Sequence, residues 1–254
     1  MKKVLVTGVT GRTGAIAWQK LCQRTDEFIP SGFARSEAKV KQLFGSTEGY
    51  FFGDVRDKAS LEGAIANCQA LIILSSAIAK MKVPPSPGQR PIFEYEPGGM
   101  PEEVDYLGQK HQIDLAKAAG VEQIVLVGSM GGTNENHPLN SMANGKVLIW
   151  KRRTEQYLID SGINYTIIRA GNLIDEPGGM RELLVGKDDS LLNAPNGIPA
   201  VIPRADVAEV VVQALREPKA INKAFDIIAQ PPHESSTPVK VDFDALFAQT
   251  TPGL

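Results

Sequence analysis

Three glycines near the start of the chain have the spacing of a turn that holds a dinucleotide. The apolar run from Val4 to Val6 predicts a strand, Gly8, Gly11 and Gly14 follow it, and an amphipathic segment rich in helix formers comes next. Glycine lets the backbone turn tightly and approach phosphates, and the free N–H groups at the start of the helix attract them. The alternative is a tight turn without a ligand. The cofactor-binding residues expected here are Gly8, Thr10, Gly11, Arg12, Thr13 and Gly14.

The residues after the second predicted strand distinguish NADP from NAD. An NAD site usually has Asp or Glu there to accept the ribose hydroxyls, whereas this chain has Arg35 and Ser36 and no acid before Glu37. An arginine can fork onto the 2′-phosphate of NADP, and a serine can donate a further hydrogen bond. Arg12, in the glycine turn, is a second cation within reach. The sequence therefore favours NADP(H); the alternative is that both arginines are solvated surface residues.

Two further strand ends are expected at the same site. Asp54 and Val55 come after the third predicted strand, and the Asp54 carboxylate can accept the adenine amino group. After the fourth, Leu74 is followed by Ser75 and Ser76, whose small side chains let the backbone approach a cofactor. Either serine has the alternative of only ending a strand. All five residues are predicted to bind the cofactor.

Apolar runs alternate with helical patterns along the chain, which predicts an α/β fold with right-handed crossovers. Several runs are short and continuous, as in strands that helices cover on both faces. We expect one domain, residues 1–254, with a doubly wound, mainly parallel sheet of about seven strands (a Rossmann fold). Gly120 and Gly162 are expected to cap helices. The predicted strands are 4–7, 28–34, 49–53, 70–74, 123–127, 165–168 and 224–228, and the predicted helices 14–24, 37–44, 58–66, 101–119, 146–161 and 204–216.

The long connections predict where a substrate binds. In a doubly wound sheet, ligands bind outside the C-terminal ends of the strands. Residues 77–100, dense in Pro and Gly, follow the fourth strand and are too long for a simple connector. Residues 130–145 and 172–203 follow the fifth and sixth strands. These three segments are predicted to form the substrate side.

Composition excludes several classes of partner and site. A net charge of −2 offers no electrostatic case for nucleic acid or an anionic membrane. No apolar run approaches the ~20 residues that a membrane helix needs. Two isolated cysteines and three widely spaced histidines predict neither a disulfide nor a metal site. A first strand that begins at Lys3 leaves no room for a targeting peptide, so a cytoplasmic protein is expected.

Motifs spread over nearly the whole chain resemble those of the atypical short-chain dehydrogenase/reductases. In that family, the plant and cyanobacterial NADP-binding branch, similar to sanguinarine reductase and more distantly to NmrA-like regulators, is the nearest group. The motifs occur in the family's order: residues 8–14 (GVTGRTG), 35–36 (RS), 53–54 (GD), 127–132 (VGSMGG), 150–152 (WKR), 168–171 (IRAG) and 203–206 (PRAD).

The resemblance assigns roles to residues at the ends of the later strands. Ser129 takes the place of the active-site serine, and Lys151 that of the lysine whose ammonium holds the nicotinamide ribose. Ala170, Gly171 and Asn172 take places that line the nicotinamide end. Ser129 and Lys151 are therefore the expected catalytic residues, and Lys151 is also expected to bind the cofactor.

The catalytic pattern of the family is broken at one position. Typical members have a Tyr four residues before the Lys, and the Lys lowers the pKa of that phenol for proton transfer. This chain has Val147 there. Tyr157 falls on another side of the helix. Tyr95, within the 77–100 segment, and Tyr106, just after it, could swing into the site, and His137 is either a proton donor or a solvent-facing residue.

Two classes of function follow from these residues. The leading interpretation is an NADPH-dependent reductase of an electron-poor, conjugated small molecule, because such an acceptor takes a hydride without a side-chain acid. The alternative is a non-catalytic protein that changes partners with the redox state of bound NADP(H), and a third possibility is a scaffold with a degraded site. A monomer or homodimer is expected.

Overall fold

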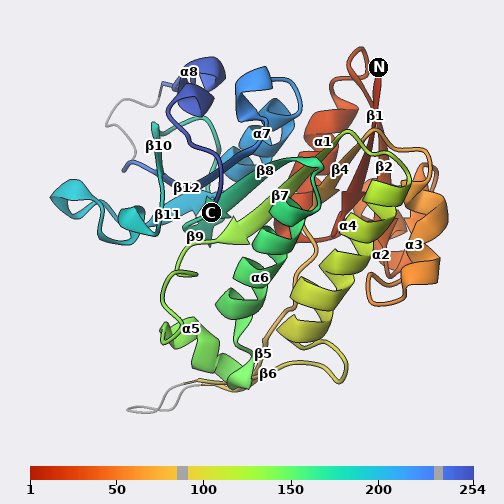
Figure 1. Cartoon of the computed structure of the whole chain (residues 1–254), viewed down its shortest axis with the longest axis horizontal. Coiled ribbons are helices and arrows are strands. Elements are labelled where there is room, and N and C mark those ends of the chain that lie inside the picture. Colours follow the sequence, from red (N-terminus) through yellow and green to blue (C-terminus); the bar gives the residue numbers. More distant parts are fainter. Residues whose placement is uncertain (85–90, 232–236) are drawn as a thin grey trace.

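An eight-stranded sheet forms the centre of the protein. The computed structural model describes residues 1–84, 91–231 and 237–254. The strand order is β10-β12-β8-β7-β4-β1-β2-β3, and every neighbouring pair is parallel except β10 with β12 (Figure 1). The strands are β1 (Lys2–Thr7), β2 (Phe28–Ala34), β3 (Tyr50–Phe52), β4 (Ala70–Ile73), β7 (Gln123–Ser129), β8 (Asn164–Ala170), β10 (Leu183–Gly186) and β12 (Lys223–Ala229).

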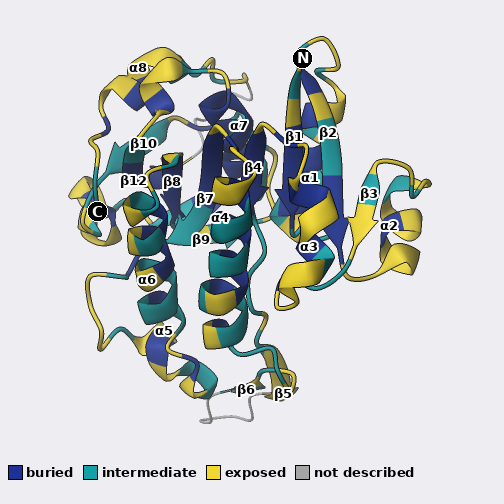
Figure 2. Cartoon of the chain, turned by 45° about the vertical axis from the view of Figure 1, so that its right-hand side comes forward, coloured by how far each residue is buried: buried dark blue, intermediate teal, exposed yellow. Residues whose placement is uncertain are grey.

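Helices cover both faces of this sheet, which explains the continuous apolar runs. Along β1, Val4 and Val6 belong to one core and Leu5 to the other, because successive side chains of a strand point to opposite faces. Figure 2 shows the central strands buried and the outward helix faces exposed. One core packs against α1 (Arg12–Cys22), α2 (Glu37–Phe44), α7 (Arg204–Ala214) and α8 (Phe243–Ala248), and the other against α3 (Lys58–Ile65), α4 (Gly108–Ala118) and α6 (Val147–Asp160).

The predicted fold class is confirmed. All seven predicted strands are present, and the bounds of β2 and α2 are those predicted. Gly120 and Gly162, with φ of +71° and +78°, adopt the left-handed conformation expected after a helix end. The eighth strand, β10, was not predicted. No helix in the described ranges is both long and apolar enough to cross a membrane.

The helix predicted over 101–119 is divided into two parts. Its first part, Glu102–Leu107, is a π-helix, and α4 continues from it without a break at Gly108. A π-turn inserts one residue into a helical repeat, which side-chain periodicity over a single turn does not reveal. The π-helix contains Asp105, a buried residue beside the candidate site.

The three segments expected on the substrate side contain short elements of their own. In residues 77–100, β5 (Lys80–Val83) pairs antiparallel with β6 (Ile92–Glu94), and residues 85–90 lie outside the described ranges. Residues 130–145 contain α5 (Pro138–Ser141) and a 3₁₀ turn, Met142–Asn144. In residues 172–203, β9 (Asn172–Ile174) pairs with β11 (Val201–Pro203), and β10 extends the main sheet. Such three- and four-residue strands are too short to show a period.

A buried ionic cluster fixes the segment after β7 to the end of the sheet. The Arg169 guanidinium donates to Glu155 Oε2 at 2.8 Å and lies 3.7 Å from Asp226 Oδ1. Asp226 accepts the backbone N–H of Asp189 at 2.7 Å, and Asp189 in turn accepts that of Gly131 at 2.6 Å. Burial raises the pKa of Asp226 to about 6, although Arg169 opposes the rise and Asp189 and Glu155 add to it. The cluster thereby makes part of the stability depend on pH.

We expect Asp226→Asn to remove a pH-dependent loss of stability. Because the pKa of Asp226 is raised in the folded state, its contribution is fully present below about pH 4 and lost as the pH rises through 6. Relative to the variant, the wild type should lose roughly 2 kcal/mol of unfolding free energy between pH 4 and pH 7.5. Urea unfolding at both pH values measures this difference. The exposed Asp244 provides the control, Asp244→Asn; a difference between wild type and Asp226→Asn that does not change with pH would contradict the expectation.

Candidate functional site

The glycine turn lies directly against the end of β4. Gly8 has a φ of +74°, and a Cβ added there would lie 2.6 Å from the carbonyl carbon of Leu74 and from the Ser75 nitrogen. A Cβ at Gly14 would overlap the Gly8 carbonyl oxygen. That oxygen accepts the Gly11 N–H at 2.8 Å. The turn has this shape only with glycine at these positions, which leaves backbone rather than side chains facing the site.

The first turn of α1 opens beside this backbone. Gly11 is the N-cap of α1, and no side chain caps the helix within the described ranges. The uncapped N–H groups and the dipole end of a helix are a ready anion site. The residues present therefore fit a pyrophosphate, as expected from the sequence.

A cleft of about 340 Å³ lies at the point where the strand order reverses, between β1 and β4. Sites for dinucleotides occur at this position in doubly wound sheets, and the volume suits a small ligand. Nine of the residues predicted to bind a cofactor line the cleft: Gly8, Thr10, Gly11, Arg35, Asp54, Val55, Leu74, Ser75 and Ser76.

Arg35 is joined in the cleft wall by Lys39 rather than by Arg12. Lys39 stands four residues after Arg35, in the first turn of α2, and both line the cleft. Ser36 caps α2, its Oγ accepting the Lys39 N–H at 3.2 Å. Arg12 forms an ion pair with Asp175 and does not line the cleft. The sequence analysis missed Lys39, although the four-residue spacing was a usable signal.

Asp54 is held by a neighbour that the sequence analysis did not assign. Arg56 donates from Nη2 to Asp54 Oδ2 at 2.6 Å and from Nε to Oδ1 at 2.9 Å, and it lines the cleft beside Asp54. Its hydrogen bonds hold the pKa of the Asp54 carboxyl below its usual range. The Asp54 carboxylate is therefore ionised and oriented at the cleft wall.

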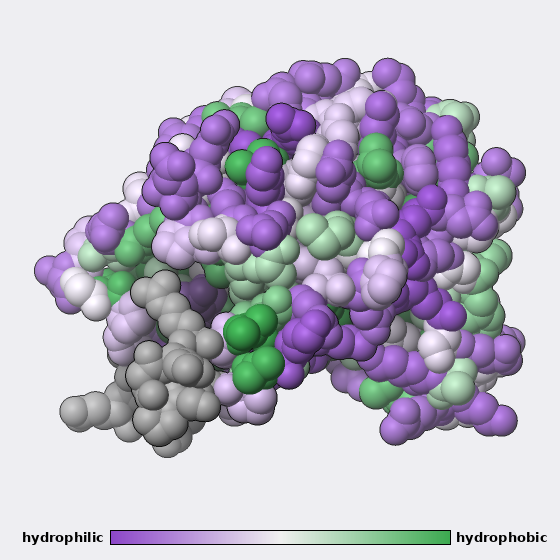
Figure 3. Space-filling model, turned by 90° about the horizontal axis from the view of Figure 1, so that it is seen from below, coloured by the Kyte–Doolittle hydropathy of each residue, from purple (hydrophilic) through white to green (hydrophobic). Residues whose placement is uncertain are grey.

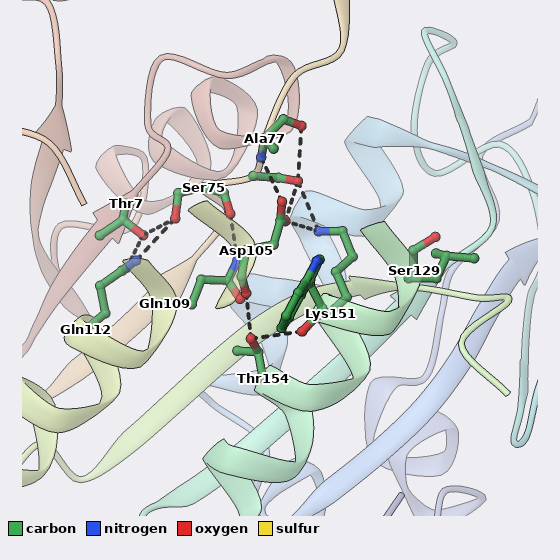
Figure 4. Close-up of polar contacts among 12 residues, drawn as sticks. Thr7, Ser75, Ala77, Asp105, Gln109, Gln112, Ser129, Lys151 and Thr154 are labelled. Atoms are coloured by element: carbon green, nitrogen blue, oxygen red, sulfur yellow. Dashed lines mark hydrogen bonds and ion pairs between the residues drawn. The ribbon is translucent and has the colours of Figure 1, made fainter. Parts of the chain in front are cut away.

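Lys151 forms a buried ion pair behind Ser76. Its ammonium donates to Asp105 Oδ1 at 2.6 Å and to Ser76 Oγ at 3.0 Å (Figure 4). Ser76 Oγ donates to Asp105 Oδ1 at 2.6 Å, and the Ala77 N–H donates to Oδ2 at 2.9 Å. The side chain of Asp105 is fully buried and that of Lys151 is 13% exposed. The sequence analysis did not single out Asp105, and the structure places it in direct contact with a predicted site residue.

Two glutamines of α4 bind Ser75, a residue of the cleft wall, from the side away from the cleft. Gln112 accepts from Thr7 Oγ1 at 2.7 Å and donates to Ser75 Oγ at 3.3 Å, and Gln109 donates to the Ser75 carbonyl at 2.8 Å (Figure 4). Asp105, Gln109 and Gln112 are spaced four and three residues apart, so they share one helix face. A helix face that packs against a sheet is normally apolar, so three polar residues on it could have indicated this hydrogen-bond network from the sequence.

The remaining predicted residues lie outside the cleft lining. Ser129 ends β7, and its Oγ donates only to the neighbouring Met130 carbonyl, at 3.1 Å, among the contacts of the described ranges. Opposite it in the sheet, Ala170 ends β8 and Gly171 and Asn172 lead into β9. Thr13 and Gly14 belong to the first turn of α1, outside the cleft lining. The structure thus places Ser129 and Lys151 in different polar environments (Figure 4).

No phenol contacts Lys151 within the described ranges. Val147 is the first residue of α6, one turn before Lys151. Tyr157 donates to Asp114 at 2.6 Å, which raises its pKa to about 12. Tyr106 stacks on Trp150 with ring centroids 5.4 Å apart.

The other two groups considered as proton donors lie near the start of α6. The Tyr95 ring packs on the buried Gly145, since a Cβ at Gly145 would lie 2.9 Å from the Tyr95 hydroxyl oxygen. Burial raises the pKa of Tyr95, which keeps its proton on the phenol. His137 Nδ1 accepts the Leu139 N–H at 3.3 Å and caps α5.

Comparison with known proteins identifies the family. Residues 8–218 match a family model described as NAD(P)H-binding. The chain belongs to this family. A nicotinamide dinucleotide is thus the cofactor class of this NAD(P)H-binding protein, in agreement with the glycine turn and the cleft.

Two plant relatives match nearly the whole chain. An uncharacterized chloroplastic protein of Arabidopsis thaliana is 55% identical over 250 residues, which cover 98% of this chain and 75% of that protein. Sanguinarine reductase of Eschscholzia californica is 49% identical over 267 residues, which cover 98% of this chain and 96% of that enzyme. Among solved structures, the oxidoreductase ylbE of Lactococcus lactis has a TM-score of 0.67 at 17% identity and covers 99% of this chain and all of its own. That likeness shows the fold alone.

The comparisons contradict the cytoplasmic location expected from the sequence. Three related plant proteins, at 55%, 30% and 28% identity, are chloroplastic. A transit peptide is removed from the mature protein and takes no part in its fold. The position of the first strand therefore carries no record of the compartment, and the expectation was wrong.

We expect Gly8→Ala to weaken dinucleotide binding by more than ~10-fold, because the added methyl pushes the turn away from β4. Gly45→Ala is the matched control. Gly45 also has a positive φ, +77°, but a Cβ there meets no atom within 4 Å, so the substitution should cost about 1–2 kcal/mol of stability. Calorimetric titration with NADPH, together with thermal unfolding, measures both effects. Equal affinities of the two variants would contradict the placement of the phosphates at this turn.

Proposed function

We propose that this protein is an NADPH-dependent reductase of an electron-poor, conjugated small molecule. One observation carries the proposal: the cleft has the backbone wall of a dinucleotide site, and Lys151, directly behind its lining residue Ser76, is paired with a carboxylate instead of a phenol. Such a site can hold the cofactor and an acceptor but lacks the usual acid for an alcohol or a simple ketone.

The preference for NADP over NAD rests on the charges at one end of the cleft. Arg35 and Lys39 stand together there, and the nearby carboxylate, Asp54, is already bound by Arg56. A 2′-phosphate carries close to two negative charges, which a guanidinium and an ammonium can bind together. An NAD site would instead offer a free carboxylate to the ribose hydroxyls. These contacts favour NADP(H).

The residues of the chain position the reaction rather than transfer its proton. Bound NADPH supplies a hydride. Gly8 and the first turn of α1 would hold the pyrophosphate, and Lys151 the nicotinamide ribose. An acceptor that is a conjugated cation or a quinone-like ring spreads the incoming electrons over its ring system, so water can deliver any proton. The reductase name of the Eschscholzia relative agrees with this class of reaction.

The arm formed by β5 and β6 supports a flat, apolar acceptor. Ile78, at the base of the arm, lines the cleft and is 64% exposed. Met81, Val83 and Ile92 are exposed apolar residues of the same arm. Figure 3 shows that the surface on this side is otherwise largely hydrophilic, with few apolar groups. Apolar side chains beside a dinucleotide cleft are suited to cover an aromatic substrate.

We expect Arg35→Ala and Lys39→Ala each to weaken NADPH binding by roughly 10-fold or more, and to leave NADH binding unchanged, because each removes a charged contact to the 2′-phosphate. Arg12→Ala is the control. Its side chain is paired with Asp175 outside the cleft lining, so NADPH affinity should change less than ~3-fold. Fluorescence titration with both cofactors measures the affinities. Equal losses for NADPH and NADH would contradict the assignment.

We expect the wild type to oxidise NADPH with iminium, quinone or flavin acceptors. The variants Tyr95→Phe and His137→Gln should turn over these acceptors within ~3-fold of the wild-type rate, because neither group is needed for proton transfer. NADPH absorbance measures the rate. Tight NADPH binding without turnover of any acceptor would contradict the reductase and favour a redox sensor. A loss of more than ~100-fold in Tyr95→Phe would identify that phenol as the acid.

A further inference from the structure

Asp105 is a fully buried carboxylate beside the predicted site, with no role in the reaction proposed above. Three donors converge on its two oxygens: the Lys151 ammonium, the Ser76 hydroxyl and the Ala77 N–H. Ser76 and Ala77 both line the cleft, so the carboxylate sits immediately behind the cleft wall. Burying a charge at this depth is costly unless it is paired and hydrogen-bonded, as this one is.

The backbone around Asp105 holds the carboxylate firmly in place. Asp105 lies in the π-helix Glu102–Leu107, which packs on α6. Its carbonyl accepts the Thr154 hydroxyl at 2.5 Å, one turn along α6 from Trp150. The carboxylate and the backbone carbonyl of Asp105 thus both accept hydrogen bonds from α6, the helix that carries Lys151. π-Turns within helices occur frequently at functional sites.

The pairing leaves Lys151 one donor. An ammonium has three N–H donors, and Asp105 and Ser76 take two of them. The Lys151 side chain is only 13% exposed, so its remaining donor has a restricted direction. We propose that Asp105 is the positioning residue for Lys151, and that it orients this third donor toward the nicotinamide ribose of the bound cofactor. The ribose contact rests on the proposed function.

The same ion pair gives Lys151 a partner where the phenol expected at position 147 is missing. An unpaired lysine beside a tyrosine lowers the pKa of the phenol, which serves proton transfer. Here the charge of Lys151 is balanced by Asp105, and Val147 has no proton to give. Lys151 thereby serves cofactor binding through the direction of its third N–H donor and not through its charge.

A mutant cycle separates positioning from a merely structural role. We expect Asp105→Asn to weaken NADPH binding by ~10-fold, because the ammonium loses its charged anchor. If Asp105 acts through Lys151, adding Asp105→Asn to Lys151→Met should change the affinity less than ~2-fold. Glu209→Gln is the control: it breaks the ion pairs with Lys20 and Arg24, which join α1 to α7, and should leave the affinity unchanged. A full ~10-fold loss in the Lys151→Met background would overturn the inference.

A second measurement needs no cofactor. Acylation of Lys151 by an amine-reactive ester, followed by mass spectrometry, should be at least ~5-fold faster in Asp105→Asn than in wild type and unchanged in Glu209→Gln, because the ammonium leaves its ion pair. Equal rates in wild type and Asp105→Asn would overturn the positioning role. A wild type that binds no NADPH would overturn the proposed function, and the acylation rates would still decide on Asp105.

If Asp105→Asn does not fold, Ser76→Ala replaces it in the affinity measurements. This variant removes one hydroxyl between Lys151 and Asp105 and keeps the ion pair. We expect a smaller loss of NADPH affinity, ~2- to 3-fold, that disappears in the Lys151→Met background. Persistence of that loss, or wild-type affinity in Ser76→Ala alone, would overturn the inference.

Discussion

The close contact between Gly8 and the end of β4 is the constraint on which the site depends. A side chain at Gly8 would collide with the Leu74 carbonyl group, so the turn after β1 and the residues after β4 must be built together. The cleft lies beside their contact, at the reversal of strand order between β1 and β4.

A second layer of polar side chains keeps that surface in place. Asp105, Gln109 and Gln112 bind the residues after β4 from the side opposite the cleft. Because these groups are buried, each needs a partner, and the partners they find are the backbone and hydroxyl groups of the cleft wall. The requirement for satisfied polar groups thus couples the position of Lys151 to the shape of the wall.

Local patterns predicted the regular elements well and the irregular ones poorly. The apolar runs of β1, β4, β7 and β8 and the caps at Gly120 and Gly162 are decided within a few residues of the chain. The β5–β6 arm and the eighth strand, β10, pair over long or irregular connections, and their short lengths carry no period. Nine residues predicted to bind a cofactor line one cleft, because motifs at strand ends meet wherever the strands are parallel.

The sequence by itself determined the fold class, the dinucleotide turn and the loss of the tyrosine at Val147, because each depends on residue type and local spacing. Only the tertiary structure decided which charges stand together. It drew Arg12 to Asp175, and it placed Asp105 against Lys151, 46 residues away in the chain. Ion pairs between distant residues leave no periodic trace, since they depend on how the helices pack on the sheet and on the need of each buried charge for a partner.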